Sequence, residues 1–391
     1  MNGILKKVWK KIVRELRDNR RRPPAIYNIG KRFLPQNSKR ALVVFSIESL
    51  PYFLKGKLEQ FPYLTHHSRY WESAEIARLL NCHGYIVDYF HSKGYPKIVW
   101  NKYDLIIDCV DNLKDAPYIA GQTKVYYSCG IHWITWNLAE LNRTRMFHER
   151  TGIVVPTNRQ IISSVSDQYA DIITYYGTDL QINSFDKKPK KIQLNISSVI
   201  IPTTRKKNIA KARNNFLWLG GGGMLHKGMD LVLEAFAKMP RANLYIAGGM
   251  EDEPKFWGWA KTIIATHENI HYLGFMDVAS RQFEEVANEC IGIVYASAAE
   301  GGPGSVAQAL HFGLIPMVTP SSLVRAEILG YSIDGSTDTE IIRSIIERVR
   351  SVMNLPEHEL RQKSDAVREF ALRYHTRSAY TESFEQLLDR I

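Results

Sequence analysis

The chain has 391 residues, 45% of them apolar and 23% charged, which indicates a globular protein of about two domains. Its net charge of +11 comes from residues 1–40, which hold 13 Lys and Arg and two acids. The neutral remainder argues against nucleic-acid binding, which favours a basic stripe on the folded surface. The four cysteines have no metal-ligand spacing, and no run of about 18 apolar residues predicts a membrane span.

An amphipathic helix is the first predicted element, over residues 4–16, with aliphatic side chains and Trp9 on one face and Lys and Arg on the other. Such a helix is typical of segments that lie in the interface of an anionic membrane. We therefore expect residues 1–22 to hold a cytoplasmic protein on the inner face of the plasma membrane. The alternative is that the apolar face packs on the N-terminal domain. The scattered thiols agree with a reducing compartment.

Alternating strands and helices begin at Ala41. The patterns predict strands at residues 41–47, 85–88, 104–108, 124–127, 153–155 and 172–175, with helices at 71–80 and 158–166. This alternation predicts an α/β domain with a mostly parallel sheet. The aromatic and basic segment 49–70 interrupts the alternation, and loops of that length are usually functional or mobile.

A polar, basic stretch near residues 202–214 is the expected linker, and the alternation then restarts. Strands are expected at residues 216–219, 244–247, 270–273, 291–295 and 315–319, and helices at 228–239, 256–266, 280–289, 305–312 and beyond 337. We expect a helix and linker at 1–40, Rossmann-like domains at 41–205 and 206–365, and C-terminal helices at 366–391 that can pack back on the first domain. Two such domains form a cleft between the carboxyl ends of their strands, where ligands bind.

Two glycine-rich loops follow strands of the second domain. Gly220–Gly223 precede Lys227, which stands at a helix start where backbone N–H groups attract anions. By itself this pattern also fits a flexible turn with a solvated lysine. The second loop, Glu300–Ser305, places a carboxylate before a helix N-terminus that suits a diphosphate. Gln308 also fits a structural interpretation, a capping box with Ser305.

The sequence of these segments resembles retaining GT-B glycosyltransferases, especially family 4. Glu300 and Gln308 stand where the family has its E-x7-E signature. The surrounding stretches follow the family's order over about residues 214–330, and they read FLWLGGGGMLHKGMDLVLEAF, LYIAGG, NIHYLGF and YASAAEGGPGSVAQALHFGLIPMVT. The N-terminal half agrees only in its order of elements. The resemblance implies two Rossmann-like domains that face each other across a cleft.

Residue roles follow from the resemblance. It implies that Glu300 contacts the donor sugar and that Gln308 contacts the ribose. It further implies a diphosphate site, made by Gly222, Gly223, Lys227, Gly301, Gly302, Gly304 and Ser305. His132, which follows the expected strand at 124–127, is the candidate that faces the donor sugar; the alternative is a core histidine beside two tryptophans. The candidates for the acceptor side are His66, His67 and Arg69, which also fit as ordinary loop residues.

Two positions depart from the family pattern. Gln308 replaces the usual Glu, and an amide lacks the charge-assisted strength of a carboxylate. Gly222 stands where the family usually has an Arg, so one diphosphate contact is missing or comes from elsewhere. Both departures concern donor affinity more than the fold.

The implied function is transfer of a sugar, with retention, from a nucleotide sugar to a saccharide or lipid-linked glycan in cell-envelope biosynthesis. No metal or other cofactor is expected, because Lys227 and the helix start at Ser305 can stabilise the departing diphosphate. One alternative is a non-catalytic nucleotide-sugar-binding subunit, motivated by the departures at 222 and 308. Another is a GT-B epimerase or phosphorylase. Turnover of nucleotide sugars with and without an acceptor distinguishes these functions.

Overall fold

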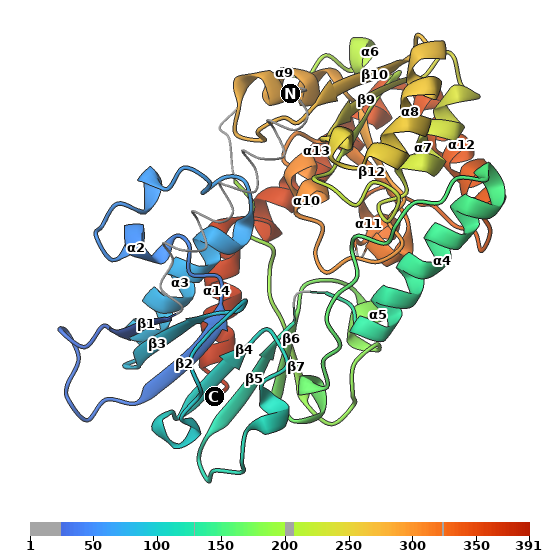
Figure 1. Ribbon diagram of the computed structural model, residues 1–391. Helices are drawn as coiled ribbons and strands as arrows, with labels where there is room; N and C mark the ends of the chain where they lie inside the picture. The colour runs from blue at the N-terminus through green and yellow to red at the C-terminus, as the bar shows by residue number, and fades with distance from the viewer. Residues whose placement is uncertain (1–24, 129, 200–206, 323) are drawn as a thin grey trace, which may run out of the picture.

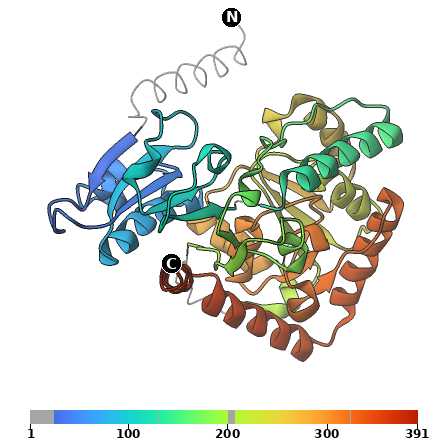
Figure 2. The ribbon, with the colours of Figure 1, turned by 90° about the horizontal axis from the view of Figure 1, so that it is seen from below.

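The computed structural model describes residues 25–128, 130–199, 207–322 and 324–391. They form two α/β domains, each built around a mostly parallel sheet, which face each other in Figure 1 and appear as two lobes in Figure 2. The amphipathic helix expected over residues 4–16 lies outside the described residues, as do residues 202–206 of the expected linker. No helix in the described part of the chain is both long and apolar enough to cross a lipid bilayer.

The N-terminal domain contains a seven-stranded sheet with the order β1-β3-β2-β4-β5-β6-β7. Its strands are β1 (Ala25–Ile29), β2 (Arg40–Phe45), β3 (Ile86–His91), β4 (Leu105–Asp108), β5 (Thr123–Tyr127), β6 (Ile172–Tyr175) and β7 (Lys190–Gln193). All neighbours are parallel except the pair of β1 and β3. The inner strands are buried apolar runs, as the sequence predicts. The patterns miss β1 and β7, because these short edge strands expose polar residues.

The end of the chain returns to this domain. Helix α14 (Arg377–Leu388) packs against α3 (Ser68–Cys82), and Figure 1 shows the red and blue helices side by side. Tyr380 and Phe384 of α14 are fully buried in the N-terminal core. The preceding helix, α13 (Glu357–Tyr374), instead packs in the C-terminal core. The last helix therefore joins the two domains.

The C-terminal domain contains a six-stranded parallel sheet with the order β10-β9-β8-β11-β12-β13. Its strands are β8 (Asn215–Leu219), β9 (Asn243–Ala247), β10 (Ile270–Gly274), β11 (Gly292–Tyr295), β12 (Ile315–Val318) and β13 (Tyr331–Ser332). The helices around it include α7 (Met229–Ala237), α8 (Pro254–Thr266), α9 (Arg281–Glu289), α10 (Gly304–Leu310) and α12 (Asp338–Asn354). The elements expected in this domain agree with these bounds to within about two residues, because their apolar patterns are strong.

Helix α4 (Trp133–Thr151) lies between β5 and β6 in the sequence but packs on the C-terminal domain. Its Phe147 is completely buried in the C-terminal core, against Phe256 and Trp259 of α8. The sequence patterns miss α4. They also wrongly predict a strand at 153–155 and a helix at 158–166, where the chain is irregular. Side chains of α4 bind the backbone of this segment, so its polar groups need no sheet or helix partner.

Candidate functional site

A cavity of about 330 Å³ lies between the two domains, at the carboxyl ends of β8, β9 and β11. Both domains line it, as do the residues that connect them. Its walls contain residues 65–68, 197–199, 219–221, 247–248, 275–278 and 302–305, with Arg159, Lys227, Tyr295, Glu300 and Gln308. The site therefore occupies the place at which open α/β sheets bind ligands.

Glu300 lies in this cavity, in the loop between β11 and α10. Its Oε1 accepts hydrogen bonds from the hydroxyl of Tyr295 at 2.6 Å and from Oγ of Ser297 at 3.1 Å. Burial and the Glu300 carboxylate raise the pKa of Tyr295 well above its usual value, so this hydroxyl remains a donor. The described residues provide no donor to Oε2 of Glu300. The carboxylate is thus held at one oxygen while the other can accept from a ligand hydroxyl.

Lys227 faces the same cavity from the start of α7. The next residue, Gly228, has φ of +69° and lies so close to β11 that an added Cβ would be 2.1 Å from the carbonyl oxygen of Ala296. Only glycine fits there, and this close approach fixes the backbone that carries Lys227. Burial lowers the pKa of Lys227, while the charge of Glu300 raises it. Among the described residues no carboxylate forms a salt bridge with Lys227, so its ammonium group can bind an anion.

The glycine-rich loop after β8 contributes different residues from those expected. Gly220 and Gly221 line the cavity, whereas Gly222 and Gly223 do not. The backbone N–H groups of Gly223 and Met224 instead donate to Oε1 of Glu253, at 2.6 and 3.1 Å. This carboxylate occupies the donors that the resemblance assigns to a diphosphate. Gly222 and Gly223 are therefore not part of the cavity wall, and their predicted contact with the diphosphate stays a prediction.

The loop before α10 contributes Gly302, Gly304 and Ser305 to the cavity wall. Gly301 is absent from the wall. Its Cα lies near Gly130, since a Cβ added to Gly130 would be 3.7 Å from that atom. A backbone hydrogen bond from Ile131 to the carbonyl of Glu300, at 3.1 Å, joins the same loop to the chain after β5. Both domains thus hold this loop.

Gln308 does not form the capping box that the spacing predicts. Helix α10 begins at Gly304 after the N-cap Pro303, so Ser305 is already inside the helix and cannot cap it. The Gln308 amide accepts from the backbone N–H of Val199 at 3.1 Å and donates to its carbonyl at 2.7 Å. Its side chain is buried at the edge of the cavity and supports the segment that connects the two domains.

His132 does not line the cavity, although the resemblance makes it the catalytic candidate. It is the N-cap of α4, where its Nδ1 accepts from the N–H of Ile134 at 3.4 Å. Its Nε2 lies 3.8 Å from the carboxylate of Asp167, and its ring meets Phe185 edge-on. These contacts hold the imidazole at the start of α4, and its expected catalytic role stays a prediction.

The three candidates for the acceptor side differ in whether they line the cavity. His66 and His67 line the cavity, and Arg69 does not. Nε2 of His66 lies 3.9 Å from the carboxylate of Asp277, so this pair crosses the cleft between the domains. The side chain of His67 reaches solvent through the open cleft. Protein atoms nevertheless surround the imidazole on its other sides, and this desolvation, together with the charge of Arg69, lowers the pKa of His67 to about 4.

Sequence reasoning missed Arg159 and His226. Arg159 comes from the irregular segment after α4 and reaches the cavity wall. His226 precedes Lys227, stacks on Trp136 with ring centroids 4.8 Å apart, and hydrogen-bonds through Nε2 to the carbonyl of Ala299 at 2.7 Å. No local pattern marks either residue, since each depends on where α4 packs. Within the described ranges, no three His, Cys, Asp or Glu side chains cluster as a metal site.

Comparisons with known proteins agree with this architecture. Residues 200–368 match the family model described as glycosyl transferases group 1. No curated protein matches the chain. The sucrose-phosphate synthase of Thermosynechococcus elongatus is 11% identical, with a TM-score of 0.58 over 90% of this chain and 99% of that one.

Two further solved structures share the fold. HepE of Anabaena, in complex with UDP and glucose, is 12% identical, with a TM-score of 0.53 over 91% of this chain and all of its own. WaaG, a glycosyltransferase involved in lipopolysaccharide biosynthesis, is 15% identical, with a TM-score of 0.50 over 88% of this chain and 98% of its own. The chain spans only 56% of the pneumococcal O-GlcNAc transferase GtfA. The chain therefore has the GT-B fold of these structures, and its residues 200–368 match the family model of the glycosyl transferases group 1.

Proposed function

We propose that this protein transfers a sugar, with retention of configuration, from a nucleoside diphosphate sugar to a saccharide or lipid-linked glycan. The main support for the proposal is that the Glu300 carboxylate and the Lys227 ammonium group line the same cavity. A carboxylate can bind sugar hydroxyls, and the ammonium can bind the diphosphate. The complex of HepE with UDP and glucose supports a uridine nucleotide as the first donor to test.

The charges that develop during sugar transfer explain why the site needs both a carboxylate and an ammonium group. As the bond between the sugar C1 and the phosphate oxygen breaks, its electron pair moves to the diphosphate and the sugar becomes oxocarbenium-like. Lys227 stabilises the negative charge on the departing diphosphate. An acceptor hydroxyl then bonds to C1 on the face that the diphosphate left, and its proton passes to a phosphate oxygen. One preorganised donor of this kind contributes about 3–4 kcal/mol.

His67 provides a neutral hydrogen-bonding group on the opposite wall. Its Nδ1 accepts from the N–H of Arg69 at 3.3 Å. With the pKa near 4, the imidazole is neutral at physiological pH, so the proton resides on Nε2. This N–H can donate to a sugar or acceptor oxygen. In this proposal, protein cations and not a metal balance the diphosphate, so excess EDTA leaves turnover unchanged.

A place in cell-envelope glycan assembly at the inner face of the plasma membrane is the second part of the proposal. The basic amphipathic pattern of residues 1–22 supports it, as does the involvement of WaaG in lipopolysaccharide biosynthesis. A lipid-linked acceptor in that membrane would meet the cleft of an enzyme held on its surface.

Turnover of UDP-glucose, UDP-GlcNAc, GDP-mannose and ADP-heptose, with and without saccharide and lipid-linked acceptors, tests the function. We expect nucleoside diphosphate release that depends on the acceptor, with the product in the donor's anomeric configuration by NMR. Binding without turnover favours the non-catalytic subunit. Conversion of the donor without acceptor favours the epimerase.

A further inference from the structure

The cavity contains a second cation beside Lys227. Arg159 lines its wall, and the positive charge of Arg159 contributes to lowering the pKa of Lys227. Its side chain lies directly over the glycine-rich loop after β8, because a Cβ added to Gly223 would be 2.4 Å from Cγ of Arg159. Gly223 is therefore the residue that makes room for this arginine.

Within the described part of the chain, no anion neutralises the guanidinium of Arg159. Among the described residues, no carboxylate lies within salt-bridge distance, and its buried Nε has no hydrogen-bond partner. A partly buried guanidinium with unused donors costs free energy unless an anion binds it. Arginine also matches the geometry of phosphate oxygens, to which it donates two parallel hydrogen bonds.

The backbone of Arg159 is held from both sides by α4. Oε1 of Glu140 accepts the N–H groups of Asn158 at 2.9 Å and of Arg159 at 2.6 Å. Nε1 of Trp136 donates to the carbonyl of Arg159 at 2.6 Å, and the guanidinium lies 5.7 Å from the centre of the Trp136 ring. The position of the guanidinium thus depends on the position of α4.

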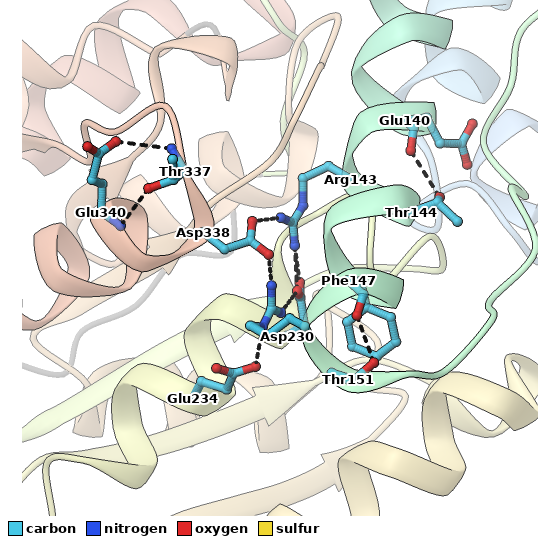
Figure 3. A network of polar contacts seen from close by, with 11 residues as sticks. Glu140, Arg143, Thr144, Phe147, Thr151, Asp230, Glu234, Thr337, Asp338 and Glu340 are labelled. Carbon is cyan, nitrogen blue, oxygen red and sulfur yellow. Dashed lines mark hydrogen bonds and ion pairs between the residues drawn. The ribbon is translucent and has the colours of Figure 1, made fainter.

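A buried ionic network fixes α4 to the C-terminal domain (Figure 3). Arg143 and Arg150 of α4 both donate to the completely buried Asp230 of α7, at 2.6 Å each. Both also pair with Asp338 of α12, and Nε of Arg150 reaches Glu234 at 2.8 Å. Although α4 belongs to the N-terminal half of the sequence, these ion pairs and the buried Phe147 attach it to the domain that carries Lys227.

We propose that Arg159 binds the diphosphate of the donor together with Lys227, and that the α4 network holds it in place before the donor arrives. This inference rests on the proposed function. The cation then comes from the segment after α4, while position 222 keeps a glycine with φ of +95°. Arg159, which lies 64 positions before Gly223 in the sequence, thus provides the positive charge at the glycine-rich loop.

Calorimetric titration of the full-length protein with UDP and with UMP tests this role, using Arg159→Met, Arg159→Lys and Lys227→Met. We expect Arg159→Met to weaken UDP binding by about 10–100-fold, as for loss of a charge-assisted hydrogen bond. UMP lacks the second phosphate, so its affinity falls much less. Arg159→Lys should recover part of the UDP affinity, because it restores the charge without the planar donor pair.

The matched control is Arg145→Met, at an exposed residue of α4 that pairs with the exposed Glu149. It should leave both affinities unchanged. The proposal is overturned if Arg159→Met loses equal affinity for UDP and for UMP. It is also overturned if Arg159→Met keeps the wild-type affinity for UDP while Lys227→Met loses it. If the wild-type protein binds neither UDP, GDP nor ADP, the proposed function itself fails, which is a different result.

Discussion

Gln308 and Val199 are joined by two hydrogen bonds, in which the side-chain amide both accepts from and donates to the backbone of Val199. The residues lie 109 positions apart, and the pair links α10 to the segment between the two domains. A carboxylate could accept the N–H of Val199 but could not donate to its carbonyl. This geometry explains why an amide stands where the resembled family has Glu.

Gln308→Glu should therefore destabilise the protein. The new carboxylate oxygen would face the carbonyl oxygen of Val199, and the lost hydrogen bond with an unpaired acceptor costs about 1–3 kcal/mol. Urea denaturation at pH 7 measures the loss, which should shrink near pH 4 as the carboxyl takes up a proton. Unchanged stability together with tighter UDP binding would instead show that residue 308 contacts ribose.

Glu300→Gln should reduce turnover by about 10–100-fold, because the neutral amide loses its charge-assisted hydrogen bonds to the donor sugar. The amide oxygen can still accept from Tyr295 and Ser297, so the melting temperature should remain close to that of the wild type. Steady-state kinetics with the identified donor provides the measurement. Near-normal turnover by the purified variant contradicts the assignment of Glu300.

Asp230→Ala should destabilise the protein by about 3–5 kcal/mol, because it leaves the buried guanidinium of Arg143 and the partly buried one of Arg150 with Asp338 as the carboxylate that they share. Glu149→Ala is the matched control, since its pair with Arg145 is exposed and contributes little. Denaturant unfolding compares the two variants. Equal effects would mean that the network does not fix α4 to the C-terminal domain.

His226 should make stability depend on pH. Burial lowers its pKa to about 4, so between about pH 4 and 6.5 the unfolded chain binds more protons than the folded one. The free energy of unfolding must then decrease as the pH falls through this window. His226→Gln should make the decrease less steep by up to about one proton, whereas the exposed His358→Gln should not. Identical slopes in all three proteins contradict the buried, neutral imidazole.

Residues 1–22 should bind anionic vesicles. Nine basic residues in this segment each contribute on the order of 1 kcal/mol at such a surface, and salt weakens the attraction. Flotation with phosphatidylglycerol vesicles should recover the full chain at low salt, but not with neutral vesicles or after deletion of residues 1–24. Equal flotation of the truncated protein would exclude this role of the segment.

Local pattern predicts most of the C-terminal domain. The apolar runs of β8 and β11 are long and bounded by glycine, so they read as buried parallel strands without any knowledge of their neighbours. The loop from Glu300 to Ser305 then follows β11 at the edge where ligands bind. The place of Glu300 and Lys227 at one cavity was predictable for this reason.

Long-range packing decides the rest. Helix α4 carries arginines on the face that packs, so its sequence has no clear apolar stripe, and its position depends on the buried carboxylates of α7 and α12 and on the burial of Phe147. That position makes His132 the N-cap of α4 and brings Arg159 to the cavity wall. The sequence by itself determined the two sheets and the glycine-rich loops, since these depend on periodicity over a few residues. The tertiary structure decided the roles of Gln308 and Arg159, because each depends on partners more than 60 positions away.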